Sequence, residues 1–200
     1  LNRRAYEPRA EWTALRNVRR NISYAWGPTG GKNGLKRADK IEFAIASKKG
    51  GKGTIYLDSL RLREIAAPPD PIPAPVVKVS GAAVGSADAP TIGTSGAAWR
   101  PAQSDASPNV TIDFGYAREF SALTLRGDNL RAYSIELSDD GKTFRESRRF
   151  EGRTGAEQLA PLYDVQSRFV RISFPRNSAP PLGLSAIEVH GPEEYADAAA

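Results

Sequence analysis

The stretch AYSIELSDDGKTF, residues 132–144, decides the fold class of this chain of 200 residues. Apolar and polar side chains alternate from Tyr133 to Leu137, which is the period-two pattern of a strand with one buried face. Asp139-Asp140-Gly141 then interrupts the alternation, since Asp tolerates turn conformations and Gly adopts positive φ at no steric cost. The apolar pattern starts again at Phe144. The stretch therefore predicts two strands joined as a hairpin.

The acidic turn has a second interpretation, as part of a calcium site. Calcium is held by about six to eight oxygen ligands, and calcium loops place these ligands at fixed spacing. Lys142 and Thr143, which follow the two aspartates, supply no ligand of the expected kind. The sequence therefore favours a turn over a metal site.

The composition favours a globular chain rich in strands. Eighteen Gly and 15 Pro among 200 residues suit short strands and tight turns better than helices. The absence of Cys excludes disulfides, thiolate nucleophiles and cysteine zinc sites. No stretch approaches the roughly 20 apolar residues that span a bilayer. The sequence starts at Leu1 and contains no Met, so we expect it to be part of a longer protein.

The net charge of +5 raises the question of an anionic partner. The basic residues are scattered in pairs, such as Arg19-Arg20 and Lys48-Lys49. They do not form the basic stripe with interleaved aromatic residues that binders of single-stranded nucleic acid use. We interpret most of them as solvated strand faces and expect no nucleic-acid partner.

Five prolines in AAPPDPIPAP, residues 66–75, divide the chain. Because such a run lacks N–H donors for a sheet and favours an extended polyproline conformation, we expect a semi-rigid linker. Before it, residues 39–47 and 53–65 alternate at period two. About four strands in this segment would make one open sheet with an uncovered apolar face. We therefore expect residues 1–65 to be the C-terminal part of a β-sandwich domain.

Residues 76–192 carry strand patterns at the short spacing of a complete β-sandwich. The predicted strands cover residues 76–80, 110–115, 120–127, 132–138, 143–150, 168–174 and 184–191, with a weaker one at 157–162. The predicted fold class is all-β, with antiparallel jelly-roll β-sandwiches, one complete and one partial. Residues 193–200 are expected to form a tail.

Four motifs in this second segment carry a family resemblance. They are Ile112–Gly115, Tyr133–Ser138 followed by Asp140-Gly141, Arg168–Ile172, and Ile187–Gly191. In this order they resemble the discoidin or coagulation factor 5/8 type C domain over about residues 76–192. The resemblance implies an eight-stranded jelly roll of the galactose-binding-like class. It also implies binding of carbohydrate or of phospholipid head groups rather than catalysis.

The sequence departs from this family pattern in SADAPTIGTSGAAWRP, residues 86–101. Asp88 and Trp99 are kept, but the Asp-Gly pair of the usual pattern is missing. The structural calcium site that the resemblance implies is therefore not supported, and we expect no metal or cofactor.

The first segment carries a resemblance of its own. The stretch ISYAWGPTGGKNGLKRADKIEFAIASKKGGKGTIYLDSLRL, residues 22–62, resembles the final strands of another galactose-binding-like sandwich. It is similar to accessory domains found ahead of discoidin-like domains in large bacterial proteins, some with glycosidase domains. The resemblance implies an accessory region of a secreted glycoside-hydrolase-type protein, in an extracellular or periplasmic location.

The residue types of this chain give little support for catalysis. A Ser–His–Asp triad would have to use the single histidine, His190, at the end of the last predicted strand. Glycoside hydrolysis needs two carboxyl groups across a cleft, and neither Glu136 and Glu188 nor the aspartates of the turn form a marked pair. We therefore expect a binding region that is not itself an enzyme.

Sugar binding needs an aromatic ring to stack on a pyranose and polar groups to bond its hydroxyls. The family resemblance places such a site on loops at one end of the sandwich. Trp99 is the best candidate for stacking, and burial in the core is an equal alternative for it. The predicted ligand-binding residues are Trp99, Arg100, Arg126, Asp128, Asn129, Arg131, Arg176 and Asn177.

These inferences favour a non-catalytic carbohydrate-binding accessory region whose partners are a polysaccharide and other domains of the same protein. One alternative is a pair of structural sandwiches that pack against a catalytic domain and bind no ligand. A second alternative, motivated by the net charge, is binding to anionic phospholipid or acidic polysaccharide surfaces.

Overall fold

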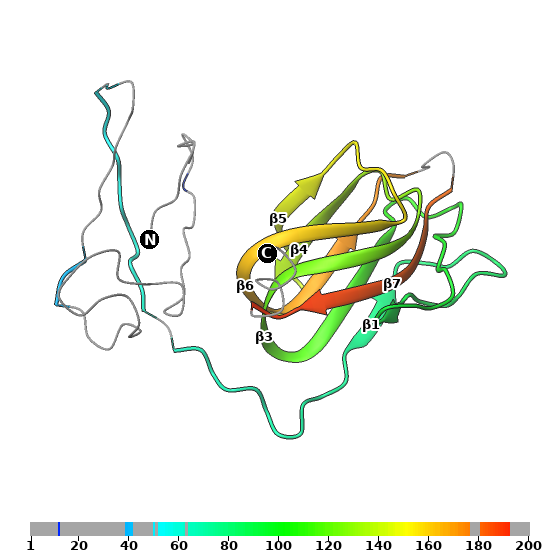
Figure 1. The fold of residues 1–200 in the computed structure, drawn as a ribbon, viewed down its shortest axis with the longest axis horizontal. Helices are drawn as coiled ribbons and strands as arrows, with labels where there is room; N and C mark the ends of the chain where they lie inside the picture. The colour runs from blue at the N-terminus through cyan, green and yellow to red at the C-terminus, as the bar shows by residue number, and fades with distance from the viewer. Residues whose placement is uncertain are drawn as a thin grey trace. The chain divides into compact units, whose positions relative to one another are not determined.

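The protein was analysed as a computed structural model that describes residues 12, 39–41, 50, 52–62, 64–176 and 181–192. It divides into two units, Leu1–Ile65 and Ala66–Ala200, which are treated separately (Figure 1). Within the described residues, all regular secondary structure is strand, and no helix could span a bilayer. The strands are β1 Val76–Val79, β2 Thr91–Ile92, β3 Asn109–Asp128, β4 Tyr133–Ser138, β5 Arg145–Phe150, β6 Glu157–Ser173 and β7 Gly183–His190.

The described residues of the first unit form no strand. Residues 52–62 and 64–65 lack ladder partners among the described residues, and Ser59 adopts a positive φ of 57°. The strand predicted over residues 53–65 is therefore not formed by its described part. Most of the other predicted strand, 39–47, lies outside the described residues. The partial sandwich stays a prediction, as does the assignment of residues 66–75 as a linker.

The second unit is a β-sandwich whose two layers share strands β3 and β6. In one layer, the first residues of β3 lie between β1 and the last residues of β6. On the other side of β6 follow β4 and then β5. In the other layer, the last residues of β3 lie between β7 and the first residues of β6. Both long strands curve from one layer into the other (Figure 1). The predicted all-β jelly-roll class is confirmed.

Two features of the predicted strand pattern need correction. The strands predicted at 110–115 and 120–127 are one strand, β3, and those at 157–162 and 168–174 are both part of β6. The register shifts between Asp113 and Arg118 and again between Phe120 and Ala122, so bulges bend β3 without a turn. The sheet is also not wholly antiparallel, since the two-residue strand β2 runs parallel to β7.

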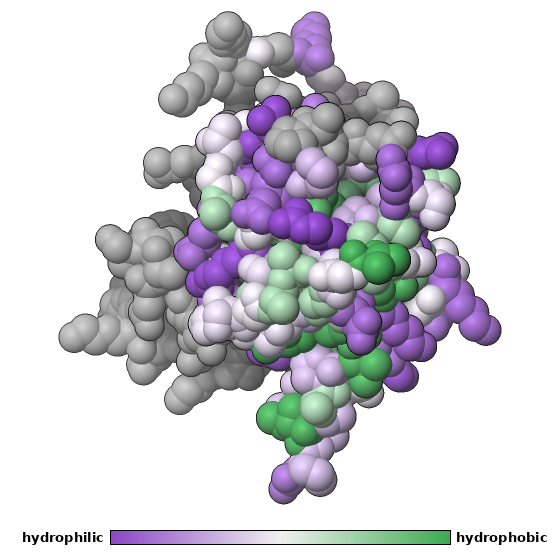
Figure 2. Space-filling model, turned by 90° about the vertical axis from the view of Figure 1, so that its right-hand side faces the viewer, coloured by the Kyte–Doolittle hydropathy of each residue, from purple (hydrophilic) through white to green (hydrophobic). Residues whose placement is uncertain are grey.

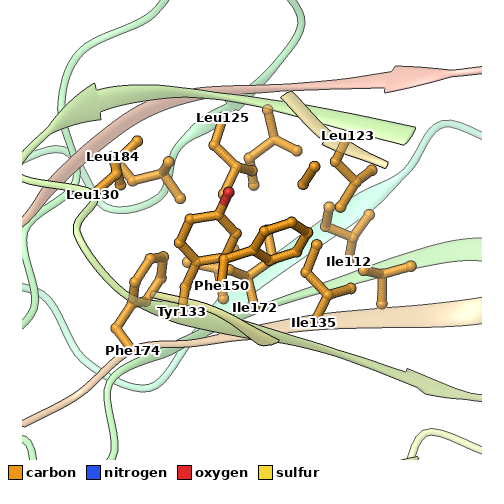
Figure 3. Packing of buried hydrophobic residues seen from close by; sticks show 14 of the residues in the cluster. Ile112, Leu123, Leu125, Leu130, Tyr133, Ile135, Phe150, Ile172, Phe174 and Leu184 are labelled. Atoms are coloured by element: carbon orange, nitrogen blue, oxygen red, sulfur yellow. The ribbon is translucent and has the colours of Figure 1, made fainter. Parts of the chain in front are cut away.

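The core lies between the layers and follows the alternation of the strands. Val110, Ile112 and Phe114 are almost fully buried, while the residues between them are partly exposed. The aromatic rings of Tyr133 and Phe150 stack with their centroids 4.9 Å apart, which ties β4 to β5. Figure 3 shows these rings facing leucines of the opposite layer. The predicted hairpin of β4 and β5 is confirmed by their antiparallel pairing.

The acidic turn between β4 and β5 is built around the Asp140 carboxylate. One of its oxygens accepts hydrogen bonds from the Lys142 and Thr143 amides, both at 2.8 Å, and from the Ser138 hydroxyl at 2.9 Å. These donors, with Thr143 first, lower the pKa of Asp140 from 3.8 to about 2. Gly141 adopts a φ of 71°, and a Cβ there would lie 2.9 Å from the Phe169 ring. The residues of this turn are thus used by the hairpin itself.

We expect this turn to stabilise the fold only while Asp140 is ionised. Because its folded-state pKa lies below the ordinary value, the stabilisation is complete above about pH 4 and is lost as the pH falls toward about 2. Urea unfolding should show a lower midpoint for Asp140→Asn than for the wild type at about pH 6, and a smaller difference at about pH 2. Asp139→Asn is the control, and an equal loss in that variant would contradict the assignment.

Candidate functional site

The candidate site lies at the end of the sandwich where β3, β5 and β6 meet their loops. The loop after β3 and the loop between β5 and β6 emerge there, beside the segment that leads into β7. We refer to this end as the loop end. Figure 2 shows the face of the molecule that lies to the right in Figure 1, where hydrophilic residues cross the middle and apolar residues lie among them in small groups.

The loops border an open hollow of about 790 Å³. Its lining is about equally polar and apolar and includes four of the eight predicted site residues. The lining residues are Arg100, Gly127, Asp128, Asn129, Leu130, Arg131, Gly152, Arg153, Thr154, Gly155, Ala156, Gln158 and Pro181.

Asn129 shapes the loop that follows β3. It has a positive φ of 58°, a conformation that Asn accepts more readily than most side chains. Its side-chain amide donates to the carbonyl of Pro181 at 2.9 Å, and its own carbonyl accepts from the Arg131 amide at 2.8 Å. This residue therefore both turns the loop and fastens it to the segment before β7.

Hydrogen bonds join the two loops into one wall. The Gly127 amide donates to the Ala156 carbonyl at 2.8 Å, and the Arg153 amide donates to the Arg131 carbonyl at 3.0 Å. The side-chain amide of Gln158, a buried residue of β6, donates to Leu130 at 2.7 Å. The shape of the hollow is thus fixed by backbone contacts that do not need a ligand.

The charged groups of the hollow come from three separate segments. Arg100 forms an ion pair with Asp128 at 3.0 Å, with both side chains well exposed. The Arg153 guanidinium donates to the Leu159 carbonyl at 3.0 Å and lies over the Phe150 ring. Arg131 is exposed, and no residue in the described part of the chain accepts a bond from its side chain.

Trp99 belongs to the core and not to the site. It is 0% exposed, and its ring nitrogen donates to the Gly81 carbonyl at 2.9 Å. Its backbone exchanges two hydrogen bonds with Leu184, and its ring lies 6.2 Å from that of Phe174. Because no face of the indole reaches solvent, the stacking role predicted for Trp99 is wrong and the core alternative is correct.

Two other predicted site residues, Arg126 and Arg176, do not line the hollow. Arg126 lies on the sheet beyond it, where it forms ion pairs with Glu188 at 2.8 Å and Glu157 at 2.9 Å. These carboxylates, Glu188 first, raise the pKa of Arg126. Arg176 is exposed after β6, outside the lining, and Asn177 lies outside the described residues. Arg126 thus has two carboxylate partners on the sheet, and its role in ligand binding stays a prediction.

Arg153 and Gln158 line the hollow but were not predicted from the sequence. A signal for Arg153 was available, because β4 and β5 form an antiparallel hairpin, so β5 ends where β4 begins. The loop after β5 must then emerge at the same end as the loop after β3. Gln158 gave no such signal, since the weak strand pattern at 157–162 did not show which of its residues face inward.

The acidic residues and the histidine considered for catalysis are engaged elsewhere. Glu136 forms an ion pair with Arg171 on the first layer, and the ring nitrogen Nε2 of His190 lies 2.7 Å from the Thr124 hydroxyl. In the part of the chain that the structure describes, no three His, Asp or Glu side chains converge where they could hold a metal ion.

The comparison with protein families decides the identity of this fold. The model of the F5/8 type C domain matches residues 78–187, more than half of the chain. The chain belongs to the F5/8 type C domain family. This match confirms the resemblance seen in the four sequence motifs. A comparison with curated proteins gives no significant match.

Solved structures share the F5/8 type C fold of this chain. CpGH89CBM32-5 from Clostridium perfringens, in complex with GalNAc-β-1,3-galactose, has a TM-score of 0.52 at 14% identity, over 58% of this chain and 95% of that one. CpGH89CBM32-6, produced by the same organism, has a TM-score of 0.50 at 21% identity, over 58% of this chain and 93% of that one. Chitosan-binding module 2 of a Paenibacillus sp. IK-5 chitosanase/glucanase was solved in complex with chitotriose. It has a TM-score of 0.51 at 20% identity, over 58% of this chain and 95% of that one. At these identities the likeness establishes the fold.

The burial of Trp99 gives a direct test of its role. We expect Trp99→Ala to lower the free energy of unfolding by about 3–5 kcal/mol, because it leaves a cavity and removes a buried hydrogen bond. Arg100→Ala, which breaks an exposed ion pair next to it, should cost only about 0–1 kcal/mol. Chemical denaturation measures both. A Trp99→Ala variant as stable as the wild type would contradict the core assignment.

Proposed function

We propose that the F5/8 type C domain of this chain is a non-catalytic carbohydrate-binding module, and that the hollow at the loop end is its saccharide site. The observation that carries this proposal is the hollow itself. It is concave, its walls are fixed by hydrogen bonds between loops, and it presents Arg, Asp and Asn side chains together. A few convergent polar groups in a preformed concavity are the usual form of a small-ligand site.

The polar groups suit the hydroxyls of a sugar. Asp128 offers carboxylate acceptors, and the guanidinium groups of Arg100 and Arg131 offer donors in a fixed fork. No aromatic residue is among those that line the hollow in the described structure. We therefore expect recognition to rest on hydrogen bonds to hydroxyls rather than on ring stacking.

The related structures support the class of ligand. The Clostridium perfringens module contains GalNAc-β-1,3-galactose and the Paenibacillus module contains chitotriose, so this fold holds saccharides in two related settings. Because their sequence identities to this chain are 14% and 20%, they do not indicate which sugar binds here.

We further propose that the domain serves as an accessory region of a larger secreted glycoside-hydrolase-type protein, in an extracellular or periplasmic location. Binding to a polysaccharide would hold an attached catalytic domain near its substrate and raise the effective substrate concentration. Even a weak site contributes in this way, because each binding event keeps the attached domain close to the polysaccharide.

A glycan array probed with the 200-residue chain tests the proposal, followed by calorimetry with the best oligosaccharide. Asp128→Ala removes the one carboxylate among the described residues that line the hollow, and Asn129→Gly keeps the positive φ while removing the side-chain amide. We expect each variant to weaken binding about tenfold, the effect of one charge-assisted hydrogen bond or of a loosened loop.

Arg145→Ala is the matched control, because Arg145 is exposed on edge strand β5 and does not line the hollow. Its affinity should equal that of the wild type. If no glycan on the array is bound, the proposal fails and a structural role in packing against another domain takes its place. If binding survives both hollow variants, the site has been assigned to the wrong part of the fold.

A further inference from the structure

The hollow carries more positive charge than a neutral sugar requires. Three arginines and one aspartate line it, which gives the lining a net charge of +2. We infer that the saccharide bound there is anionic, with a carboxylate or sulfate group placed among Arg100, Arg131 and Arg153. This inference rests on the proposed carbohydrate-binding function and names the chemical class of its ligand.

Arg131 is the residue most available to the ligand. Its side chain is exposed, and within the described ranges it has neither an ion pair nor a hydrogen bond. Other arginines of this sandwich are engaged, as Arg126 is with two glutamates and Arg168 is with Asp113. Because Arg131 also lines the hollow, its donors are available to a ligand there.

Arg153 is held beside Arg131 by the fold. The backbone hydrogen bond of 3.0 Å between the Arg153 amide and the Arg131 carbonyl places the two residues on facing loops. The Arg153 guanidinium is then oriented by the Leu159 carbonyl and the Phe150 ring, and one hydrogen bond uses one of its five N–H donors. Both residues line the hollow, and guanidinium donors there suit the oxygens of a carboxylate or sulfate, which accept paired bonds from such forks.

Asp128 does not neutralise this pair. Its carboxylate forms an ion pair with Arg100 at 3.0 Å. Along the chain, two residues separate Asp128 from Arg131. Arg100 also lies within 3.4 Å of the Leu182 carbonyl, which holds it at the rim. The excess of positive charge is therefore concentrated at Arg131 and Arg153.

Gln158 holds the wall of the hollow next to these arginines. The residue is 2% exposed, and its amide nitrogen donates to the carbonyls of Leu130 and Gly155, so the orientation of the amide is determined. The loop that carries Arg131 is therefore fixed by a buried side chain of β6 before any ligand binds.

The same charges would attract an anionic membrane, but the shape favours a saccharide. The arginines line a hollow of about 790 Å³ between loops, whereas a bilayer presents a broad surface and rewards apolar side chains that insert into it. The apolar residues of the lining do not provide such an anchor, since Leu130 is 1% exposed and Ala156 is small. A vesicle arm in the experiment separates the two cases.

Calorimetry with the 200-residue chain and three oligosaccharides tests this inference. The probes are a galacturonate trisaccharide, its neutral methyl ester, and a sulfated galactose oligosaccharide. We expect at least one anionic probe to bind about tenfold or more tightly than the ester, with an affinity that falls as salt rises. Arg131→Ala should lower the affinity for that probe about tenfold and lower the affinity for the ester by a clearly smaller factor, because the ester loses hydrogen bonds but no charge pairing. Circular dichroism and the Tm of each variant verify that it is folded.

Arg145→Ala removes the same charge from edge strand β5 and should leave the preference for the anionic probe intact. Equal affinities for the acid, the sulfate and the ester would overturn the anionic assignment while leaving sugar binding in place. Loss of all binding, including binding to neutral glycans on the array, would overturn the proposed function itself. Binding to vesicles that contain phosphatidylserine but to no anionic oligosaccharide would also overturn the inference and favour a membrane partner.

Discussion

The pairing of β3 with β6 is the constraint on which the rest of this structure depends. Each strand runs through both layers, so one antiparallel register fixes the spacing of the layers, the inward residues and the positions of the strand ends. The bulges after Asp113 and Phe120 let the pair bend without losing its ladder. A shift of one residue in this register would turn Val110 and Ile112 toward solvent and would separate the loops that form the hollow.

The pairing of β3 with β6 also makes the hollow rigid. Gly127, close to the end of β3, bonds to Ala156, and Gln158 on β6 holds the loop at Leu130. A Cβ on Gly127 would lie 2.0 Å from the Gly183 carbonyl oxygen, so the close approach of β3 and β7 excludes any larger residue. The loops are therefore short, tied segments, and a ligand meets groups that are already in place. Preorganisation of this kind reduces the entropy lost on binding.

The sequence predicted the fold class well because period two is a local signal. The alternation around Ile112 and Ile135 is enough to mark strands and their buried faces, since it needs no knowledge of which strands pair. Strand β2 is too short to show a period, and Gly115 in the bend of β3, with a φ of 75°, looks like a turn residue between two strands. Trp99 could not be assigned because a lone aromatic residue beside an arginine suits a core and a sugar site equally. Its burial depends on the contact with Leu184, more than eighty residues away in the chain.

Only the three-dimensional structure separates the arginines that are paired with carboxylates from those that are not. A net charge of +5 shows an excess of basic residues but does not locate it. On the sheet faces, Arg168 and Arg171 are matched by carboxylates from neighbouring strands, so their charges are already compensated. At the loop end, Arg131 and Arg153 come from two loops that line the hollow, and the carboxylate of Asp128 among the lining residues is paired with Arg100. Positive charge that no carboxylate of the fold compensates is available to a ligand in a concave site. The contrast between paired arginines on the sheet faces and unpaired ones at the loop end links the architecture of the sandwich to its proposed chemistry.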